Sequence, residues 1–270
     1  MVIKVMEIIT SLKNPKVMDA LKLNERKHRE ETGLFLIEGA RELHLALKGG
    51  TELYRLFYCE ENFRDDEADI VEAALNKGAE LIPVTAKVFQ KMVYREGSSG
   101  VLAVARQDKK KFNDIPLSSP PLLVVIESTE KPGNLGAILR SADAAGADGV
   151  IVCGKSIDIY NPNVVRASMG ALFTVSVVEA TTEETIQWLK DNKISMIAAT
   201  PDAETVYFDA DLSKACAIVM GSEHEGLQNT LLNAADIKVM IPMKGETDSL
   251  NLSAATAVIL YEAIRQRRVK

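Results

Sequence analysis

Cysteine, histidine and long apolar runs are scarce in this sequence, and each scarcity excludes a class of protein. The 270 residues include three cysteines (Cys59, Cys153 and Cys216) and three histidines, none at metal-ligand spacing. The cysteines stand singly, mostly in apolar runs, so we expect reduced core residues of a cytoplasmic protein and no metal site. No run of about eighteen uncharged apolar residues occurs, and residues 1–8 lack the layout of a signal peptide, so we expect no membrane span.

Basic residues are also fewer than acidic ones, which argues against a protein whose whole surface binds nucleic acid. The net charge is −6, but residues 1–112 carry 19 Lys and Arg against 18 Asp and Glu. Basic residues cluster between Lys13 and Arg29 and again over 106–111. Such clusters predict either a local surface for a polyanion or ordinary solvated helix faces.

The first part of the chain alternates between helical and strand-like patterns. Residues 14–31 carry spaced apolar side chains amid charge, which predicts one basic amphipathic helix. The strands that we predict after it are 34–39, 53–59, 80–84 and 100–106, and the helices are 40–48, 65–77 and 86–94. We therefore expect a small α/β domain over 1–107 and a charged, then Ser- and Pro-rich linker over 108–121.

The second part, residues 122–270, alternates again with longer apolar strands. The predicted strands are 122–127, 149–153, 175–178, 194–199, 217–220 and 237–241, and the predicted helices are 134–145, 162–171, 183–192 and 251–267. Continuous apolar strands with helical crossovers predict a parallel sheet covered on both faces. Ligands of such sheets lie beyond the carboxyl ends of the strands. This rule selects three loops, 128–134, 221–226 and 243–249.

Each loop carries polar residues with two possible roles. Asn134 can cap the helix that follows it, and Arg140 in that helix needs either a structural ion pair or a ligand. The second loop holds Gly221 and Gly226 without a P-loop Lys or a GxGxxG pattern, so it is either a tight turn or a contact for adenine or ribose. The third ends in three polar residues within five positions, which exceeds what a helix cap requires.

Taken together, these segments resemble the three motifs of the SpoU (TrmH) RNA 2′-O-methyltransferases of the SPOUT superfamily. The similar segments are 134–140, 221–227 and 241–253, in the family's order and spacing. The stretch from Lys27 to Leu43 is also similar to the family's N-terminal substrate-binding domain. Lys131 departs from the acidic residue that the family often has before the first motif.

The resemblance implies a fold, a cofactor and partners. The fold would be an α/β SPOUT domain with a deep trefoil knot, preceded by a smaller α/β domain like that of some ribosomal proteins. S-adenosyl-L-methionine would be bound in a bent form by the knot. The partners would be RNA and a second copy of the chain, joined through the C-terminal domain, and neither DNA nor a membrane.

The resemblance also assigns roles to residues. Those implied in catalysis are Asn134, Arg140, Glu223, Asn251 and Ser253. Those implied in cofactor binding are Thr200, Gly221, Ser222, Gly226, Ile241, Met243, Ser249 and Leu250. Those expected to contact RNA are Lys13, Lys27, Arg29, Arg41 and Arg166. Because a guanidinium is a poor base, we expect Arg140 to stabilise the developing alkoxide while the proton leaves to a phosphate oxygen, Glu223 or water.

The two-domain layout and the N-terminal similarity resemble those family members that modify large-subunit ribosomal RNA, and this resemblance favours 23S ribosomal RNA as the substrate. The alternatives are a tRNA ribose 2′-O-methyltransferase, an antibiotic-resistance methyltransferase acting on the same ribosomal RNA, and a catalytically silent, knotted RNA-binding protein. An ordinary nucleotide-binding α/β enzyme is disfavoured because the phosphate-binding motifs are missing.

Overall fold

The computed structural model describes residues 7–64, 67–94, 99–154 and 158–268. Contacts within the chain group it into two compact units, the first containing Met1–Asp108 and Tyr160–Thr174, and the second Lys109–Ile159 and Val175–Lys270. The sequence pattern assigns residues 160–174 to the second domain, whereas in the structure they pack with the first unit. Over the described ranges, no helix is both long and apolar enough to cross a membrane.

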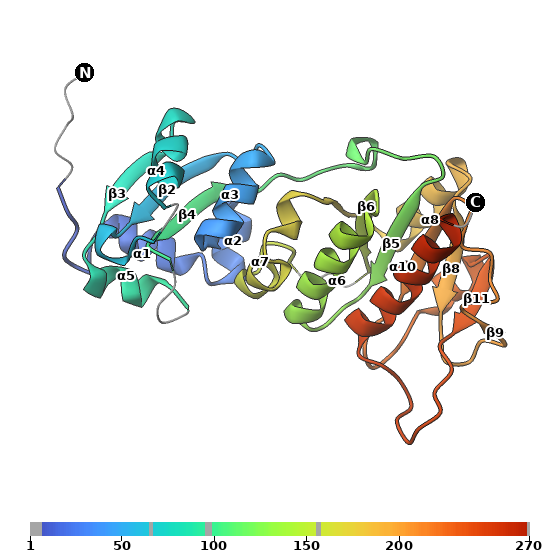
Figure 1. Cartoon of the computed structure of the whole chain (residues 1–270). Coiled ribbons are helices and arrows are strands. Elements are labelled where there is room, and N and C mark those ends of the chain that lie inside the picture. Colours follow the sequence, from blue (N-terminus) through green and yellow to red (C-terminus); the bar gives the residue numbers. More distant parts are fainter. Residues whose placement is uncertain (1–6, 65–66, 95–98, 155–157, 269–270) are drawn as a thin grey trace. The chain divides into compact units, whose positions relative to one another are not determined.

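Four strands of mixed direction form the sheet of the first unit (Figure 1). β1 (Leu34–Glu38) and β2 (Leu53–Tyr58) flank β4 (Val101–Arg106) and run antiparallel to it, and β3 (Glu80–Pro83) runs parallel to β2. The helices of this unit are α1 (Pro15–Lys22), α2 (Arg26–Thr32), α3 (Ala40–Lys48), α4 (Glu67–Asn76), α5 (Ala86–Met92) and α7 (Pro162–Ser168), with 3-10 turns η1 (Glu60–Asn62) and η3 (Ala171–Phe173). The predicted alternation is confirmed, and the first two residues of the helix predicted at 65–77 lie outside the described residues.

The single basic helix predicted over 14–31 is wrong, because α1 and α2 are separated by three non-helical residues. Arg29 holds the chain at this break. Its side chain is 1% exposed, and its Nη1 donates to the carbonyl of Leu23 at 2.6 Å. An apolar pattern cannot reveal such a break, because residues 24–32 contain no apolar side chain and the residue that α2 buries is the charged Arg29.

Seven strands, all parallel, form the sheet of the second unit in the order β7-β6-β5-β10-β8-β11-β9. The strands are β5 (Leu122–Glu127), β6 (Gly149–Cys153), β7 (Ser176–Glu179), β8 (Ser195–Ala199), β9 (Thr205–Val206), β10 (Cys216–Met220) and β11 (Ile237–Met240). The helices are α6 (Pro132–Ala145), α8 (Thr182–Asp191), α9 (Asn229–Ala234) and α10 (Leu252–Arg268), and η2 (Phe112–Asp114) precedes the first strand. The predicted parallel sheet is confirmed, whereas the short β9 and α9 were not expected.

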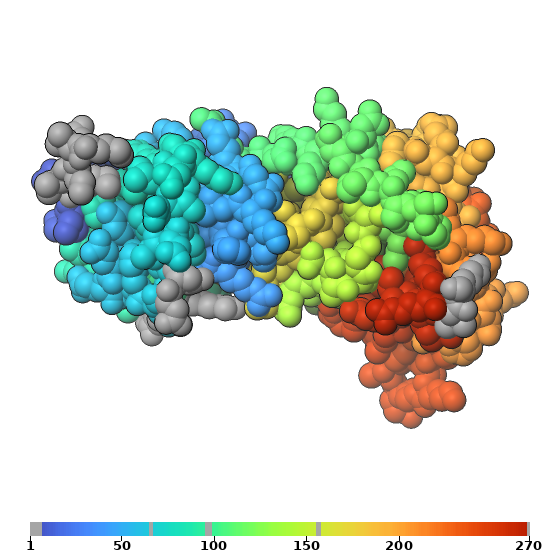
Figure 2. Space-filling model, turned by 45° about the horizontal axis from the view of Figure 1, so that its top comes forward, coloured from blue at the N-terminus to red at the C-terminus, as the bar shows by residue number. Residues whose placement is uncertain are grey.

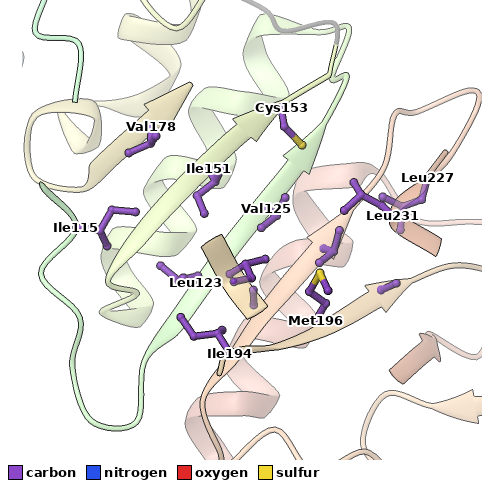
Figure 3. Packing of buried hydrophobic residues seen from close by; sticks show 14 residues of the cluster. Ile115, Leu123, Val125, Ile151, Cys153, Val178, Ile194, Met196, Leu227 and Leu231 are labelled. Carbon is purple, nitrogen blue, oxygen red and sulfur yellow. The ribbon is translucent and has the colours of Figure 1, made fainter. Parts of the chain in front are cut away.

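Helices cover both faces of this sheet. The packing of α8 and α9 buries one face, where Leu123 and Val125 of β5 meet Ile151 of β6 and Leu231 of α9 (Figure 3). The other face lies under α6 and α10, which pack against each other and against β6 and β10 respectively. Every residue of β5 is buried, as its unbroken apolar run predicts. The rigid sheet fixes the places where the loops at its carboxyl edge begin.

Candidate active site

Three loops leave the carboxyl ends of strands in the second unit. The first joins β5 to α6, the second follows β10, and the third joins β11 to α10. β5 and β10 are paired directly, with Ile126 opposite Met220 at the last shared position, so the first two loops start side by side. The end of the third loop reaches them because α10 packs against α6. The predicted convergence of the loops is therefore present in the structure.

A series of hydrogen bonds joins polar side chains from all three loops. The hydroxyl of Ser253 donates to Oδ1 of Asn251 at 2.7 Å, and the amide of Asn251 donates to Oδ1 of Asn134 at 3.1 Å. The amide of Asn134 in turn donates to Oε1 of Glu223 at 2.5 Å. We call these four side chains the polar network. All donors point along the series toward the carboxylate, and such head-to-tail bonds strengthen one another and fix both amides in one orientation.

Glu223 ends the polar network as an acceptor with several donors. Its Oε2 accepts the backbone N–H of Glu130 at 3.1 Å, and its Oε1 also lies 3.5 Å from the hydroxyl of Thr129. Burial opposes ionisation of this carboxyl, but the hydrogen bonds from Glu130 and Asn134 outweigh it and hold the pKa of Glu223 below its ordinary value. Glu223 is therefore a fixed negative charge at neutral pH and a weak base.

Asn134 is a partner of Glu223 and does not cap a helix. The helix α6 begins two residues earlier than predicted, because Pro132 occupies its first turn, where a missing N–H has no cost. The predicted capping role of Asn134 is thus wrong. Its side chain is 8% exposed and bonds across to the second loop instead.

Arg140 lies outside the polar network. It is six residues beyond Asn134 in α6, which turns its side chain about 120° away from that of Asn134 around the helix. Its side chain is exposed, and it makes no hydrogen bond or ion pair with any described residue. The structural ion pair considered for Arg140 is therefore not formed with the described residues. The side chains of Asn134 and Ser253 bond to other partners.

The second loop is a closed turn that depends on its glycines. The N–H of Ser222 donates to the carbonyl of Gly226 at 2.9 Å, and the hydroxyl of Ser222 accepts the N–H of Glu225 at 3.0 Å. A Cβ on Gly221 would lie 2.1 Å from the carbonyl carbon of Gly226, which itself has a φ of +66°. The turn interpretation of these residues is supported by this geometry, and it also sets where Glu223 points.

The backbone N–H groups of the third loop have no partner among the described residues. Ile241 and Met243 are half-buried, whereas residues 244–251 are exposed, including Ser249 and Leu250. No backbone N–H over 241–251 donates to a described residue. Figure 2 shows this segment, in orange-red, standing out from the surface of the second unit. Half-buried N–H groups need a partner, so this backbone is suited to hold a ligand.

Thr200 lies beside the start of the third loop. It follows β8, and its N–H donates to the carbonyl of Val239 in β11 at 2.9 Å. Its half-buried position at the carboxyl edge of the sheet is compatible with the predicted cofactor contact.

Glu127 is a structural residue that the sequence pattern did not single out. It is fully buried at the end of β5, where its carboxylate accepts the N–H of Gln228 at 2.8 Å and the hydroxyl of Thr182 at 3.3 Å. It thereby fixes the end of the second loop to β5. The acidic residue that closes an otherwise apolar strand was the available indication, since a buried charge requires partners.

The cations expected to contact RNA differ in their availability. Lys13 and Arg41 are exposed, and neither side chain forms an ion pair with a described residue. Lys27 is exposed too and stands 3.9 Å from Glu31, a separation that binds weakly in solvent. These three cations can reach a polyanion.

Two of the expected cations are engaged within the first unit. Arg29 is buried against Leu23, so its assignment as an RNA contact is wrong. Arg166 forms an ion pair with Glu38 at 3.7 Å, and its guanidinium lies 4.1 Å from the ring centroid of Tyr94. Tyr94 itself was not among the predicted residues.

Both halves of the chain match known protein families. Residues 121–261 match the model of the SpoU rRNA Methylase family, and residues 14–103 match the MRM3-like substrate binding domain. A 23S rRNA (uridine(2479)-2′-O)-methyltransferase of Streptomyces viridochromogenes is 32% identical over 91% of this chain and 87% of its own.

Solved structures are similar over nearly the whole chain. An RNA 2′-O ribose methyltransferase is 42% identical with a TM-score of 0.85, over 97% of this chain and 100% of its own. An AdoMet-bound rRNA methyltransferase from Sinorhizobium meliloti is 32% identical with a TM-score of 0.89, over 96% of this chain and 98% of its own. The likeness thus includes both units.

Proposed function

The chain belongs to the SpoU rRNA methylase family, and we propose that it methylates a ribose 2′-hydroxyl of 23S ribosomal RNA with S-adenosylmethionine as methyl donor. The polar network carries this proposal, because it brings the three motif segments together at the edge of the sheet where ligands of parallel sheets bind. The substrate is RNA because DNA has no 2′-hydroxyl.

The backbone of the second and third loops is suited to S-adenosylmethionine, which supplies an activated methyl group on a sulfonium. Ile241 and Met243 are half-buried residues whose N–H groups donate to no described residue. Gly221 lets the second loop close on the backbone of Gly226, which fixes the shape of this loop. We assign adenosine binding to these groups, with Thr200 at the neighbouring strand end. Ser249 and Leu250 would close over the ligand, and the trefoil knot stays a prediction of the resemblance.

The polar network would position the ribose. Each Asn amide carries two N–H groups, and the network uses one from Asn134 and one from Asn251. The second N–H of each donates to no described residue and would serve oxygen atoms of the substrate. Alignment of the hydroxyl with the methyl group is the main task, and it can contribute roughly 7–11 kcal/mol in favourable cases. Glu223 acts as a positioning residue that holds Asn134.

Arg140 would act on the charge that develops at the hydroxyl oxygen. Because a guanidinium is a poor base, Arg140 would stabilise an alkoxide and would not accept the proton. Glu223 is a poor acceptor as well, because its pKa is lowered and its oxygens already receive hydrogen bonds. Of the acceptors considered, a phosphate oxygen of the RNA or water remains.

A second copy of the chain would complete the site. Arg140 does not reach the polar network of its own chain, and Tyr261 of α10 is 51% exposed on the same helix layer. We assign the dimer contact to α6, α10 and the third loop. Mixing inactive Arg140→Ala and Asn134→Ala chains should restore methyl transfer, because a mixed dimer holds one intact site. No restoration in mixed dimers would refute a shared site.

The first unit would select the RNA. Its exposed cations Lys13, Lys27 and Arg41 are available for phosphate contacts, which position a nucleic acid without specifying its sequence. We also assign the protein to the cytoplasm, where it would meet a ribosomal RNA substrate.

Single-turnover methyl transfer tests the proposal. Unmodified 23S ribosomal RNA and bulk tRNA are incubated with excess enzyme and radiolabelled S-adenosylmethionine. We expect transfer to 23S RNA, and a rate at saturating enzyme that falls sharply for Arg140→Ala and Arg140→Lys. Transfer to tRNA alone would favour the tRNA alternative, and RNA binding without transfer would favour a silent binding protein. Near wild-type rates in both variants would remove Arg140 from the site.

A further inference from the structure

The first unit contains a pocket that the proposed methyl transfer does not use. Its floor is apolar and is formed by Leu36, Met92, Leu102 and Val165. Polar residues stand around it: Asn24, Glu38, Lys91, Tyr94 and Arg166. All of these residues belong to the first unit, so the pocket is complete within it.

An organised aromatic and cationic pair stands at this pocket. The carboxylate of Glu38 accepts the backbone N–H of Tyr94 at 3.0 Å and pairs with Arg166 at 3.7 Å. The guanidinium of Arg166 lies 4.1 Å from the Tyr94 ring centroid. Glu38 therefore holds both groups, and Arg166 covers one face of the ring. The ring is still 74% exposed, so Arg166 leaves much of it open.

The remaining polar groups are suited to a nucleotide. The amide of Asn24 donates to the carbonyl of Leu21 at 3.0 Å, and its Oδ1 accepts no hydrogen bond from a described residue. The ammonium of Lys91 is exposed and forms no ion pair with the described residues. An open aromatic face, a free amide acceptor and a cation match the π-face, the edge and the phosphate of one nucleotide.

We propose that this pocket binds one unpaired nucleobase of the RNA substrate, stacked on the open face of Tyr94. The proposal rests on the proposed function, because it takes RNA as the ligand. Bases within an RNA helix are stacked and unavailable, whereas loop and bulge bases are recognised by stacking on aromatic side chains and by hydrogen bonds to their edges. The pocket would thus contribute to the choice of RNA by a route separate from phosphate contacts.

Binding of short single-stranded RNA tests the pocket without requiring methylation. Fluorescence anisotropy is measured with labelled homopolymers of A, C, G and U, and with an abasic ribose-phosphate strand of equal length. Stacking of one base predicts that Tyr94→Ala weakens the tightest homopolymer by about 5- to 100-fold. Tyr94→Phe should bind as the wild type does, because the ring is kept. The matched control is Tyr54→Ala, another exposed tyrosine beside arginines that does not line the pocket.

These measurements test the pocket and the methyl transfer independently. Unchanged affinity in Tyr94→Ala would overturn the proposal, as would an equal loss for the abasic strand or an equal loss in Tyr94→Phe. In single-turnover methylation of 23S RNA, Tyr94→Ala should raise the half-saturating enzyme concentration and leave the maximal rate unchanged. A wild-type enzyme that fails to methylate RNA would refute the proposed function, while the anisotropy series would still decide the pocket.

Discussion

Replacing Glu223 by glutamine removes the charge at the end of the polar network and changes little else. The glutamate accepts from the amide of Asn134, the N–H of Glu130 and the hydroxyl of Thr129. Glutamine has one acceptor oxygen and one donor NH₂ group, so one of the two N–H donors would face another donor. The amide of Asn134 would then lose its fixed orientation.

The expected loss of rate follows from the hydrogen bond that is weakened. A hydrogen bond to a charged group contributes about 1.5–3 kcal/mol. If that orientation is needed in the transition state, the loss corresponds to a fall of about 10- to 100-fold in rate. The variant would misalign the ribose and keep the cofactor contacts. We therefore expect a lower maximal rate with little change in S-adenosylmethionine affinity.

The assay is single-turnover methylation of 23S RNA with saturating enzyme, and Glu225→Gln is the matched control. Glu225 lies in the same loop and is exposed, and its side chain makes no hydrogen bond with a described residue. We expect the control to keep the wild-type rate. A Glu223→Gln rate within about twofold of the wild type would refute the role given to the polar network.

The same variant has a predicted pH signature. The pKa of Glu223 is lowered in the folded state, because accepted hydrogen bonds outweigh its burial. The carboxylate therefore stabilises the fold above its unfolded pKa, and this stabilisation is lost as the pH falls through the folded pKa. The melting-temperature difference between wild type and Glu223→Gln should be constant near neutral pH and narrow in acid. A difference that widens in acid would contradict the sign of the shift.

Three further predictions concern stability and reactivity. Gly221→Ala should lower stability by about 1–3 kcal/mol, since its Cβ would lie 2.1 Å from the backbone of Gly226. Gly133→Ala, where a Cβ meets nothing within 4 Å, should be neutral or stabilising in the same thermal melts. Arg29→Ala should cost about 1–3 kcal/mol in urea unfolding and leave RNA affinity unchanged, and a selective loss of RNA affinity would contradict its burial. Burial raises the pKa of Cys153 to about 11, so iodoacetamide at pH 8 should label it after unfolding and spare it in the folded protein.

Patterns of apolar residues were sufficient to predict the sheet of the second unit. Unbroken apolar strands such as β5 require cover on both faces, and helical crossovers then make the sheet parallel. Loops at its carboxyl ends could also be selected in advance, because strand direction determines where they gather. The short β9 and α9 were missed because neither is long enough to show a period.

Side-chain partners were beyond the reach of the sequence. Asn134 was expected to cap its own helix, whereas its bond to Glu223 spans 89 positions along the chain. Arg29 was counted among the surface cations because its neighbours are charged, although its side chain is buried and donates to a backbone carbonyl. Residues 160–174 were assigned to the second domain because their neighbours in sequence are there. In each case the deciding contact is tertiary and leaves no periodic trace.

The most direct measurement is the chemical position of the methyl group on the RNA. Unmodified 23S RNA is methylated with radiolabelled S-adenosylmethionine and then hydrolysed in alkali, which cleaves beside every free 2′-hydroxyl. We expect the label in an alkali-resistant dinucleotide with the wild-type enzyme, and at a strongly reduced rate with Glu223→Gln. Label in mononucleotides, which would place the methyl group on a base, would contradict it.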